Sequence, residues 1–200
     1  MRRPISATES AARCVATVAL ALLLTGAADS PGHVPEPDGL WQGVMRGYTP
    51  NSVKGARVLD TAEAVRLIEE KTPVLLDVGP ADKRPASMSQ TTPWMPAHRS
   101  IPGAVWMPGG GSGTPDAQFS ESFRSRVAAL TGGDVERPII TFCHPECWGS
   151  WNAAKRLVGF GYKEVYWYPD GLEGWQTERE PVTVTPDPVW ALAAPADQPK

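Results

Sequence analysis

Two cysteines, Cys143 and Cys147, lie four residues apart in the segment FCHPECWGS, residues 142–150. A short apolar run, residues 138–142, precedes the first cysteine, and a helical pattern begins after the second. A loop that leads into a helix N-terminus points backbone N–H groups inward, where they stabilise an anion. Such a place favours a thiolate over a thiol, and the thiolate is the nucleophile and the metal ligand. The pattern therefore predicts thiol chemistry at this loop.

Three kinds of chemistry fit a cysteine pair with this spacing, and the residues alone leave them open. In the first, Cys143 and Cys147 cycle between dithiol and disulfide, because a loop of this length can close a reducible bridge. In the second, the two thiolates bind a soft metal such as Cu(I), with His144 or His98 as a third ligand. In the third, the bridge is static and fixes the loop of a non-catalytic binding module, for which no cofactor is required.

Other residues are candidates for supporting this loop. Asp77 ends a second buried run, residues 73–78, and we expect it to hydrogen-bond loop N–H groups rather than act as a catalytic carboxylate. Three roles are open for Trp148: a lid over the sulfur, an exposed anchor for a partner protein, or a residue packed on the loop. We interpret His98, which precedes a turn, as a surface or capping residue. The further candidate supporting residues are His144, Glu146, Gly149 and Ser150.

The first thirty residues have the layout of a secretory signal peptide. Arginines flank the start of an apolar run over residues 14–24, which is too short to span a bilayer comfortably, and small residues follow it. We expect cleavage after Ala28 and no stable membrane span afterwards. The mature chain then keeps only the two cysteines of the loop and enters an oxidising compartment, which we take to be the periplasm.

The composition narrows the class of protein. Among 200 residues there are 19 Lys and Arg against 22 Asp and Glu, a formal net charge of -3, which argues against nucleic acid as a partner. Three cysteines are too few for a disulfide-stapled scaffold. The 42% of hydrophobic residues can form a core, while 19 Gly and 21 Pro predict many loops.

Strand and helix patterns alternate along the chain. Strands are predicted within residues 73–78, 104–107, 138–142 and 164–168, and helices after Asp60, over residues 119–130 and over residues 151–158. Residues 79–100 are predicted to be a long polar loop, and the glycines of residues 109–113 a flexible one. Such alternation indicates βαβ units and a mostly parallel sheet, in which functional groups gather at the carboxyl ends of the strands.

Four motifs then occur in the order typical of the rhodanese-like family. They are residues 74–78 (VLLDV), 101–105 (IPGAV), 140–143 (ITFC), and 161–166 (GYKEVY) followed by 170–175 (DGLEGW). The chain resembles this family over residues 55–178. We therefore expect a signal peptide at 1–28, an irregular N-terminal arm at 29–54, a rhodanese-like domain at 55–178 and a flexible C-terminal tail at 179–200. The family implies an α/β fold with a central, mostly parallel β-sheet flanked by helices.

A narrower resemblance involves the cysteine–tryptophan loop and the helix that follows it. The loop and residues 151–156 (WNAAKR) resemble the periplasmic "CXXCW motif" group associated with pyrroloquinoline-quinone (PQQ)-dependent alcohol catabolism, although the spacing here is C-x3-C-W. This resemblance implies redox or sulfur handling at Cys143, with Cys147 as the resolving partner, in support of periplasmic proteins of PQQ-dependent alcohol oxidation. The alternative is a binding or copper-delivery module of the same fold.

The family resemblance also implies that Cys143 is the position that carries a persulfide in sulfurtransferases. Active sulfurtransferase loops place an arginine and a glycine shortly after that cysteine, whereas this loop continues with His144, Pro145 and Glu146. A carboxylate near the sulfur, such as that of Glu146, opposes a thiolate. Thiol oxidoreductase and sulfurtransferase activities both stay open at this point, with the sequence favouring the former.

Overall fold

The computed structural model of the protein describes residues 34–89 and 91–193. Its centre is a five-stranded parallel sheet in the order β1-β6-β5-β2-β4. The strands are β1 (Arg57–Val58), β2 (Val74–Asp77), β4 (Val105–Trp106), β5 (Ile139–Phe142) and β6 (Val165–Tyr168). The flanking helices are α1 (Thr61–Lys71), α2 (Ala117–Thr131), α3 (Trp148–Gly159) and α4 (Gly171–Glu178). The predicted α/β fold with a central parallel sheet is confirmed.

Local features of the sequence explain where these elements begin and end. The Asp60 carboxylate accepts the N–H of Glu63 at 2.8 Å, and the Glu63 carboxylate accepts the N–H of Asp60 at 3.1 Å, which is the predicted capping box of α1. Gly132 ends α2 with φ 67, a left-handed conformation that costs glycine little. Strands β2, β5 and β6 are buried along their whole length, which explains their nearly continuous apolar runs.

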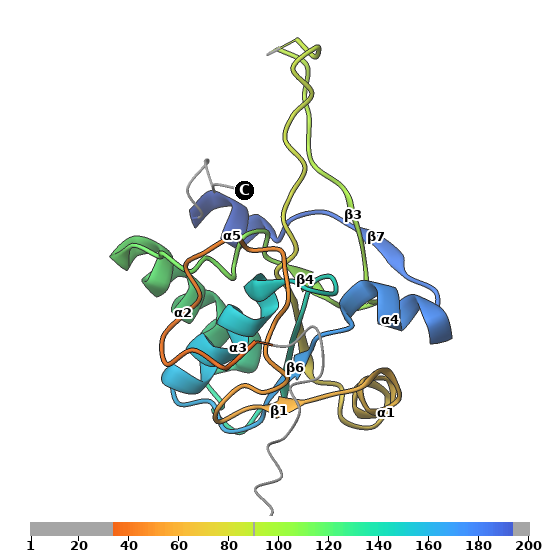
Figure 1. The fold of residues 1–200 in the computed structure, drawn as a ribbon. Helices are drawn as coiled ribbons and strands as arrows, with labels where there is room; N and C mark the ends of the chain where they lie inside the picture. Colours follow the sequence, from red (N-terminus) through yellow and green to blue (C-terminus); the bar gives the residue numbers. More distant parts are fainter. Residues whose placement is uncertain (1–33, 90, 194–200) are drawn as a thin grey trace, which may run out of the picture.

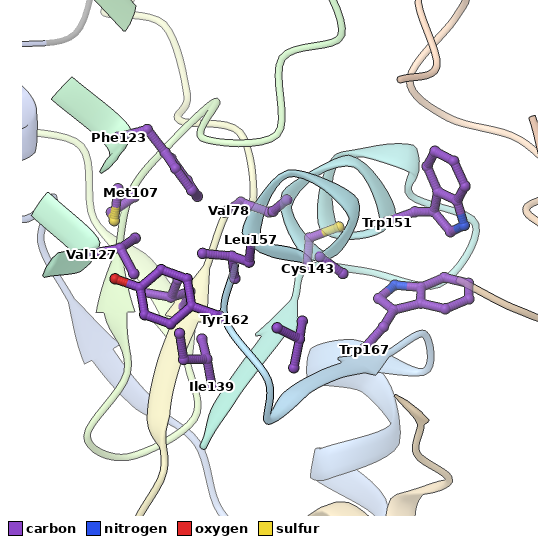
Figure 2. Close-up of a cluster of buried hydrophobic side chains, with 14 of the residues drawn as sticks. Val78, Met107, Phe123, Val127, Ile139, Cys143, Trp151, Leu157, Tyr162 and Trp167 are labelled. Carbon is purple, nitrogen blue, oxygen red and sulfur yellow. The ribbon is translucent and has the colours of Figure 1, made fainter. Parts of the chain in front are cut away.

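Helices cover both faces of the sheet, and each face has its own hydrophobic core. Helices α2 and α3 pack on one face, and α1 and α4 on the other (Figure 1). The larger core lies under α2 and α3 and includes Phe123, Trp167 and Cys143 (Figure 2). The smaller core includes Val65 and Trp175. Strand β5 lies in the middle of the sheet, so the residue that follows it, Cys143, enters the larger core.

The C-terminal segment differs from the flexible tail predicted for residues 179–200. Strand β7 (Val182–Val184) pairs antiparallel with β3 (His98–Ser100), and α5 (Pro188–Ala193) packs on α2. Trp190 is fully buried, with its ring edge-on to those of Phe119 and Phe123 at centroid distances of 5.2 and 6.0 Å. The prediction is therefore wrong for residues 182–193, because burial of one large aromatic side chain outweighs a composition rich in Pro and Ala.

Asp187 fixes the start of α5 through two sets of hydrogen bonds. Its carboxylate accepts hydrogen bonds from Nε and Nη2 of Arg126, on α2, at 2.9 and 2.6 Å. The same carboxylate accepts the N–H of Trp190 at 2.9 Å, as a helix cap does. Arg126 and Asp187 are both largely shielded from solvent, so this two-point ion pair holds α5 in one orientation on α2.

The connection between β2 and β3 was predicted as a polar loop over residues 79–100. Its last three residues, 98–100, instead form β3, because β7 supplies the antiparallel partner. The rest of this connection projects from the body of the domain (Figure 1).

The predicted signal peptide, residues 1–28, lies outside the described residues, as does the beginning of the predicted arm. Residues 34–54, called the arm below, contain no helix or strand. Within the part of the chain that the structure describes, no helix combines the length and apolar character required to cross a membrane.

The packing of α5 leads to a first prediction. We expect Trp190→Ala to lower the free energy of unfolding by about 3–5 kcal/mol, since it removes a fully buried aromatic side chain. Val189→Ala is the matched control, because Val189 is 54% exposed and its truncation leaves no cavity. Urea unfolding followed by far-UV circular dichroism measures both. Equal effects of the two substitutions would contradict a docked α5.

Candidate functional site

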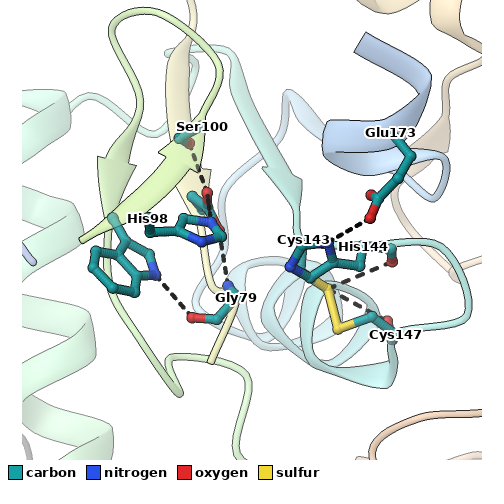
Figure 3. Close-up of polar contacts among 9 residues, drawn as sticks. Gly79, His98, Ser100, Cys143, His144, Cys147 and Glu173 are labelled. Carbon is teal, nitrogen blue, oxygen red and sulfur yellow. Dashed lines mark hydrogen bonds and ion pairs between the residues drawn. A yellow bond between two sulfur atoms is a disulfide. The ribbon is translucent and has the colours of Figure 1, made fainter. Parts of the chain in front are cut away.

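The two cysteines of the loop form a disulfide at the carboxyl end of β5 (Figure 3). Their Cα atoms are 6.5 Å apart. Cys143 follows β5 directly and is 2% exposed, whereas Cys147 is partly exposed and is the N-cap residue of α3. The cysteine loop, residues 143–147, therefore joins a buried strand to a helix N-terminus, with one cysteine in the core and the other partly exposed.

The arm pairs with this loop through its backbone. The N–H of Gly47 donates to the carbonyl of Glu146 at 2.8 Å, and the N–H of Trp148 donates to the carbonyl of Met45 at 2.9 Å. These two bonds flank an antiparallel bridge between Arg46 and Cys147. One of the N–H groups at the N-terminus of α3, which would otherwise face a bound anion, is thus satisfied by the arm.

Trp148 packs beneath the arm and is 2% exposed. Its ring stacks on that of Trp41 with centroids 4.2 Å apart and an interplanar angle of 11°, and lies edge-on to Trp151 at 5.3 Å. Of the three predicted roles, the structure supports packing on the loop, the exposed anchor is wrong because Trp148 is buried, and the lid over the sulfur stays a prediction. The stack buries apolar surface between the arm and α3 directly beside the disulfide.

Asn152, one turn into α3, joins the arm to a second irregular segment. Its side-chain oxygen accepts the N–H of Trp41 at 2.8 Å, and its Nδ2 donates to the carbonyls of Trp41 at 2.9 Å and Gly111 at 3.0 Å. Asn152 is fully buried. This one amide therefore makes three hydrogen bonds to backbone groups that have no secondary-structure partner there.

Arg156 extends this contact by one more helical turn. Its guanidinium donates to the carbonyls of Gly110 at 2.7 Å and Ser112 at 2.5 Å, and it lies 5.2 Å from the ring centroids of Phe119 and Phe123. Burial lowers the pKa of Arg156 to about 10, since desolvation disfavours the charged form. The two carbonyls and two rings offset that penalty, so the segment predicted as a flexible glycine loop, residues 109–113, is fixed by a buried cation.

Gly149 and Ser150 complete the first turn of α3. A Cβ at Gly111 would lie 2.0 Å from the carbonyl oxygen of Gly149, so the glycine loop contacts the helix backbone at a distance that only glycine permits. The Ser150 hydroxyl donates to the Cys147 carbonyl at 3.2 Å and accepts the indole N–H of Trp167 at 3.0 Å. Ser150 thereby links the cysteine loop to β6.

Asp77 ends β2 beside the cysteine loop and is completely buried. Its carboxylate accepts the backbone N–H of Gly79 at 2.8 Å, which is the kind of loop contact expected for it, and the Ser100 hydroxyl at 2.6 Å. It also lies 2.8 Å from Nε2 of His98, whose ring stacks on Trp106. The interpretation of His98 as a surface or capping residue is wrong, since its side chain is only 12% exposed.

His144 is held by a carboxylate on another element. Its Nδ1 lies 2.8 Å from the Glu173 carboxylate on α4, and its ring lies edge-on to that of His98 at 5.7 Å. Helix α4 reaches the loop because Gly171 has φ 53 and a Cβ there would lie 2.2 Å from the carbonyl oxygen of Cys143. Two histidines, each bound to a carboxylate, thus lie next to each other beside the loop (Figure 3).

The predicted copper site is not formed in this oxidised state. Cys143 and Cys147 are bonded to each other, so thiolates for copper(I) would require the reduced pair. Both candidate histidine ligands, His98 and His144, already engage a carboxylate. Among the described residues, no group of three or more His, Cys, Asp and Glu side chains is arranged to hold a metal ion.

A parallel sheet with a cysteine loop between a central strand and a helix N-terminus defines a class of α/β proteins suited to thiol chemistry. The family model of the rhodanese-like domain matches residues 60–178, more than half of the chain. The chain therefore belongs to the rhodanese-like family.

Solved structures with a similar fold come from several organisms. A rhodanese-like domain from Anabaena sp. is 18% identical, with 71% of this chain and 86% of that chain covered and a TM-score of 0.41. A polysulfide-sulfur transferase from Wolinella succinogenes is 20% identical, with 64% and 80% covered and a TM-score of 0.40. A human single-domain sulfurtransferase is 17% identical, with 62% and 99% covered and a TM-score of 0.39. No curated protein matches the chain.

Sequence reasoning missed several residues that shape the site. Glu173, Asn152 and Arg156 were not proposed as site residues, and neither was the arm. For Asn152 a signal existed, since a polar residue on the otherwise apolar face of a helix must find a buried partner. For Glu173 none existed, because its contact with His144 depends on the approach of α4.

The role of Asn152 yields a second prediction. We expect Asn152→Ala to cost about 2–4 kcal/mol of stability, because it leaves buried carbonyls without donors. It should also release the arm, so that trypsin cuts native protein after the exposed Arg46. Asn51→Ala is the matched control, since Asn51 is exposed. Limited proteolysis with mass spectrometry measures the cut, and unchanged resistance of Asn152→Ala would contradict the proposed attachment.

Proposed function

We propose that the protein is a thiol–disulfide redox protein built on the rhodanese-like fold, in which Cys143 and Cys147 alternate between disulfide and dithiol. The observation that carries this proposal is the disulfide at the carboxyl end of β5, between a buried cysteine and a partly exposed one. A bridge with one partly exposed cysteine can exchange with an external thiol, whereas a wholly buried bridge cannot.

The contacts of the loop argue against persulfide transfer as the main activity. A persulfide on Cys143 requires a free sulfur, which the bridge to Cys147 leaves only in the reduced state. The nearest basic side chains after the loop are also engaged elsewhere. Lys155 donates to the carbonyl of Pro37 at 2.7 Å, and Arg156 donates to the glycine loop. Neither is available to bind an anionic sulfur donor at Cys143.

The two carboxylate-bound histidines suit the proposed exchange. Reduction of the bridge takes up two electrons and two protons, so groups that move protons close to the sulfurs are useful. His144 follows Cys143 directly, and its hydrogen bond to Glu173 fixes the ring. We assign proton transfer to this residue, and His98, held by Asp77, lies next to it with ring centroids 5.7 Å apart.

A third prediction tests the redox proposal. With excess reduced glutathione, the oxidised protein should lose its bridge and gain two alkylation sites per chain, and removing glutathione under air should reverse the change. The reduced protein should form no more thiocyanate from thiosulfate and cyanide than Cys143→Ser does. Mass spectrometry and a colorimetric thiocyanate assay give the readouts. A bridge that resists glutathione, together with thiocyanate formation dependent on Cys143, would mean sulfurtransfer instead.

We further propose that the protein is exported to the periplasm and supports PQQ-dependent alcohol oxidation. The support for this proposal is the signal-peptide pattern of residues 1–28 and the resemblance of the loop and residues 151–156 to the CXXCW group. An oxidising compartment would keep the pair in the disulfide state between cycles. Its partners there would be the periplasmic proteins of that alcohol oxidation.

A fourth prediction concerns this biological role. In its native host, loss of the protein should slow growth on an alcohol as the sole carbon source and leave growth on an organic acid unchanged. The wild-type chain should restore growth, and Cys143→Ser should not. Growth curves on the two carbon sources measure the effect. Restoration of growth by Cys143→Ser would mean that the role in alcohol oxidation does not require the cysteine pair.

A further inference from the structure

We infer that an external thiolate attacks the bridge at Cys147, and that Cys143 is the leaving sulfur, which resolves the mixed disulfide when the reaction runs in reverse. This inference rests on the proposed redox function and reverses the order of roles that the family resemblance implies. Burial, the direction of attack and the charge beside Cys147 all make Cys147 the entry point of the reaction.

Burial separates the two sulfurs. Cys143 is 2% exposed and belongs to the larger core, together with Val78 and Trp148, whereas Cys147 is partly exposed and borders that core. Thiol–disulfide exchange depends on which sulfur the attacking thiolate can reach. A thiolate from solvent meets Cys147 first, while an approach to Cys143 would have to displace core side chains.

The direction of attack also indicates that Cys147 is attacked and that Cys143 leaves. In disulfide exchange the attacking, central and leaving sulfurs lie close to a line. Attack at the partly exposed Cys147 drives the leaving electrons onto Cys143, which lies in the core. Attack at Cys143 would have to come from the core side and drive the leaving electrons outward.

Each sulfur also has surroundings that suit its assigned role. Arg46 is paired directly opposite Cys147 in the antiparallel bridge, between the bonds Gly47 N–H to Glu146 and Trp148 N–H to Met45. Residues opposite each other in such a pair project to the same face, so the exposed Arg46 is a cation beside the outer sulfur. It would attract an incoming thiolate. Cys143, at the other end of the loop, lies in the larger core, where an incoming thiolate does not reach it from solvent.

The thiolate of a donor bonds to Sγ of Cys147, the bond from Sγ of Cys147 to Sγ of Cys143 breaks, and its electron pair leaves on Cys143. A second donor thiolate then attacks the donor's own sulfur in the mixed disulfide and releases Cys147 as a thiolate. The donor is oxidised to a disulfide, the protein pair is reduced by two electrons, and the two donor protons end on the two cysteines.

The fifth prediction compares two single-cysteine variants. In native buffer, Cys143→Ser, which keeps Cys147, should react with iodoacetamide at least about tenfold faster than Cys147→Ser, which keeps the buried Cys143. The difference should disappear in denaturant. Circular dichroism establishes that each variant is folded. Equal rates in native buffer, or faster reaction of Cys147→Ser, would overturn the assignment.

Two further measurements keep the assignment independent of folding and of the proposed function. Reduced wild-type protein is treated with less than one equivalent of iodoacetamide and then cleaved after Glu146, which separates the two cysteines. Label on Cys143 would overturn the inference.

The second measurement adds Arg46→Gln to the Cys143→Ser variant. This substitution should slow the reaction of Cys147 with anionic oxidised glutathione but not with neutral iodoacetamide, and Arg99→Gln is the matched control. These rates are measured on reduced protein. They therefore test which cysteine is accessible even if glutathione cannot reduce the wild-type bridge.

Discussion

The site depends on a set of hydrogen bonds that one face of α3 makes to backbone groups outside regular structure. Asn152 binds the arm at Trp41 and the glycine loop at Gly111, and Arg156 binds the same loop one turn later. Carbonyl and N–H groups in irregular segments must be satisfied when they are buried, and here side chains of one helix satisfy them. With the arm fixed, Met45 and Gly47 can pair with the cysteine loop. The geometry of the disulfide thus depends on residues that take no part in its chemistry.

This arrangement changes what the rhodanese-like fold can do at its cysteine loop. The fold places Cys143 at the end of a central strand and at a helix N-terminus, which favours an anion there. In this chain the arm accepts the Trp148 N–H hydrogen bond, a second cysteine is bonded to the sulfur of the first, and Lys155 and Arg156 hold other segments. A site suited to a bound anionic sulfur species therefore becomes a site suited to a pair of exchanging sulfurs.

The sequence predicts the sheet, the capping box of α1 and the position of the cysteine loop, because these follow from local periodicity and capping. It does not predict the contacts of the arm, since the groups used at Trp41, Met45 and Gly47 include backbone atoms common to every residue. His98 appeared to precede a simple turn, yet its partner Asp77 is on another strand. The ordered C-terminal segment was missed because Trp190 is a single anchor within a Pro- and Ala-rich stretch. Each miss concerns a contact between distant segments that no local pattern encodes.

The reduction potential of the Cys143–Cys147 couple tests the account most directly. It is obtained by equilibrating the protein with glutathione or dithiothreitol redox buffers and counting free thiols by alkylation and mass spectrometry. A cycling pair should have a potential between about -270 and -120 mV, the range of thiol oxidoreductases. A potential below about -300 mV would mark a structural bridge, and the protein would then be a binding module with a static disulfide.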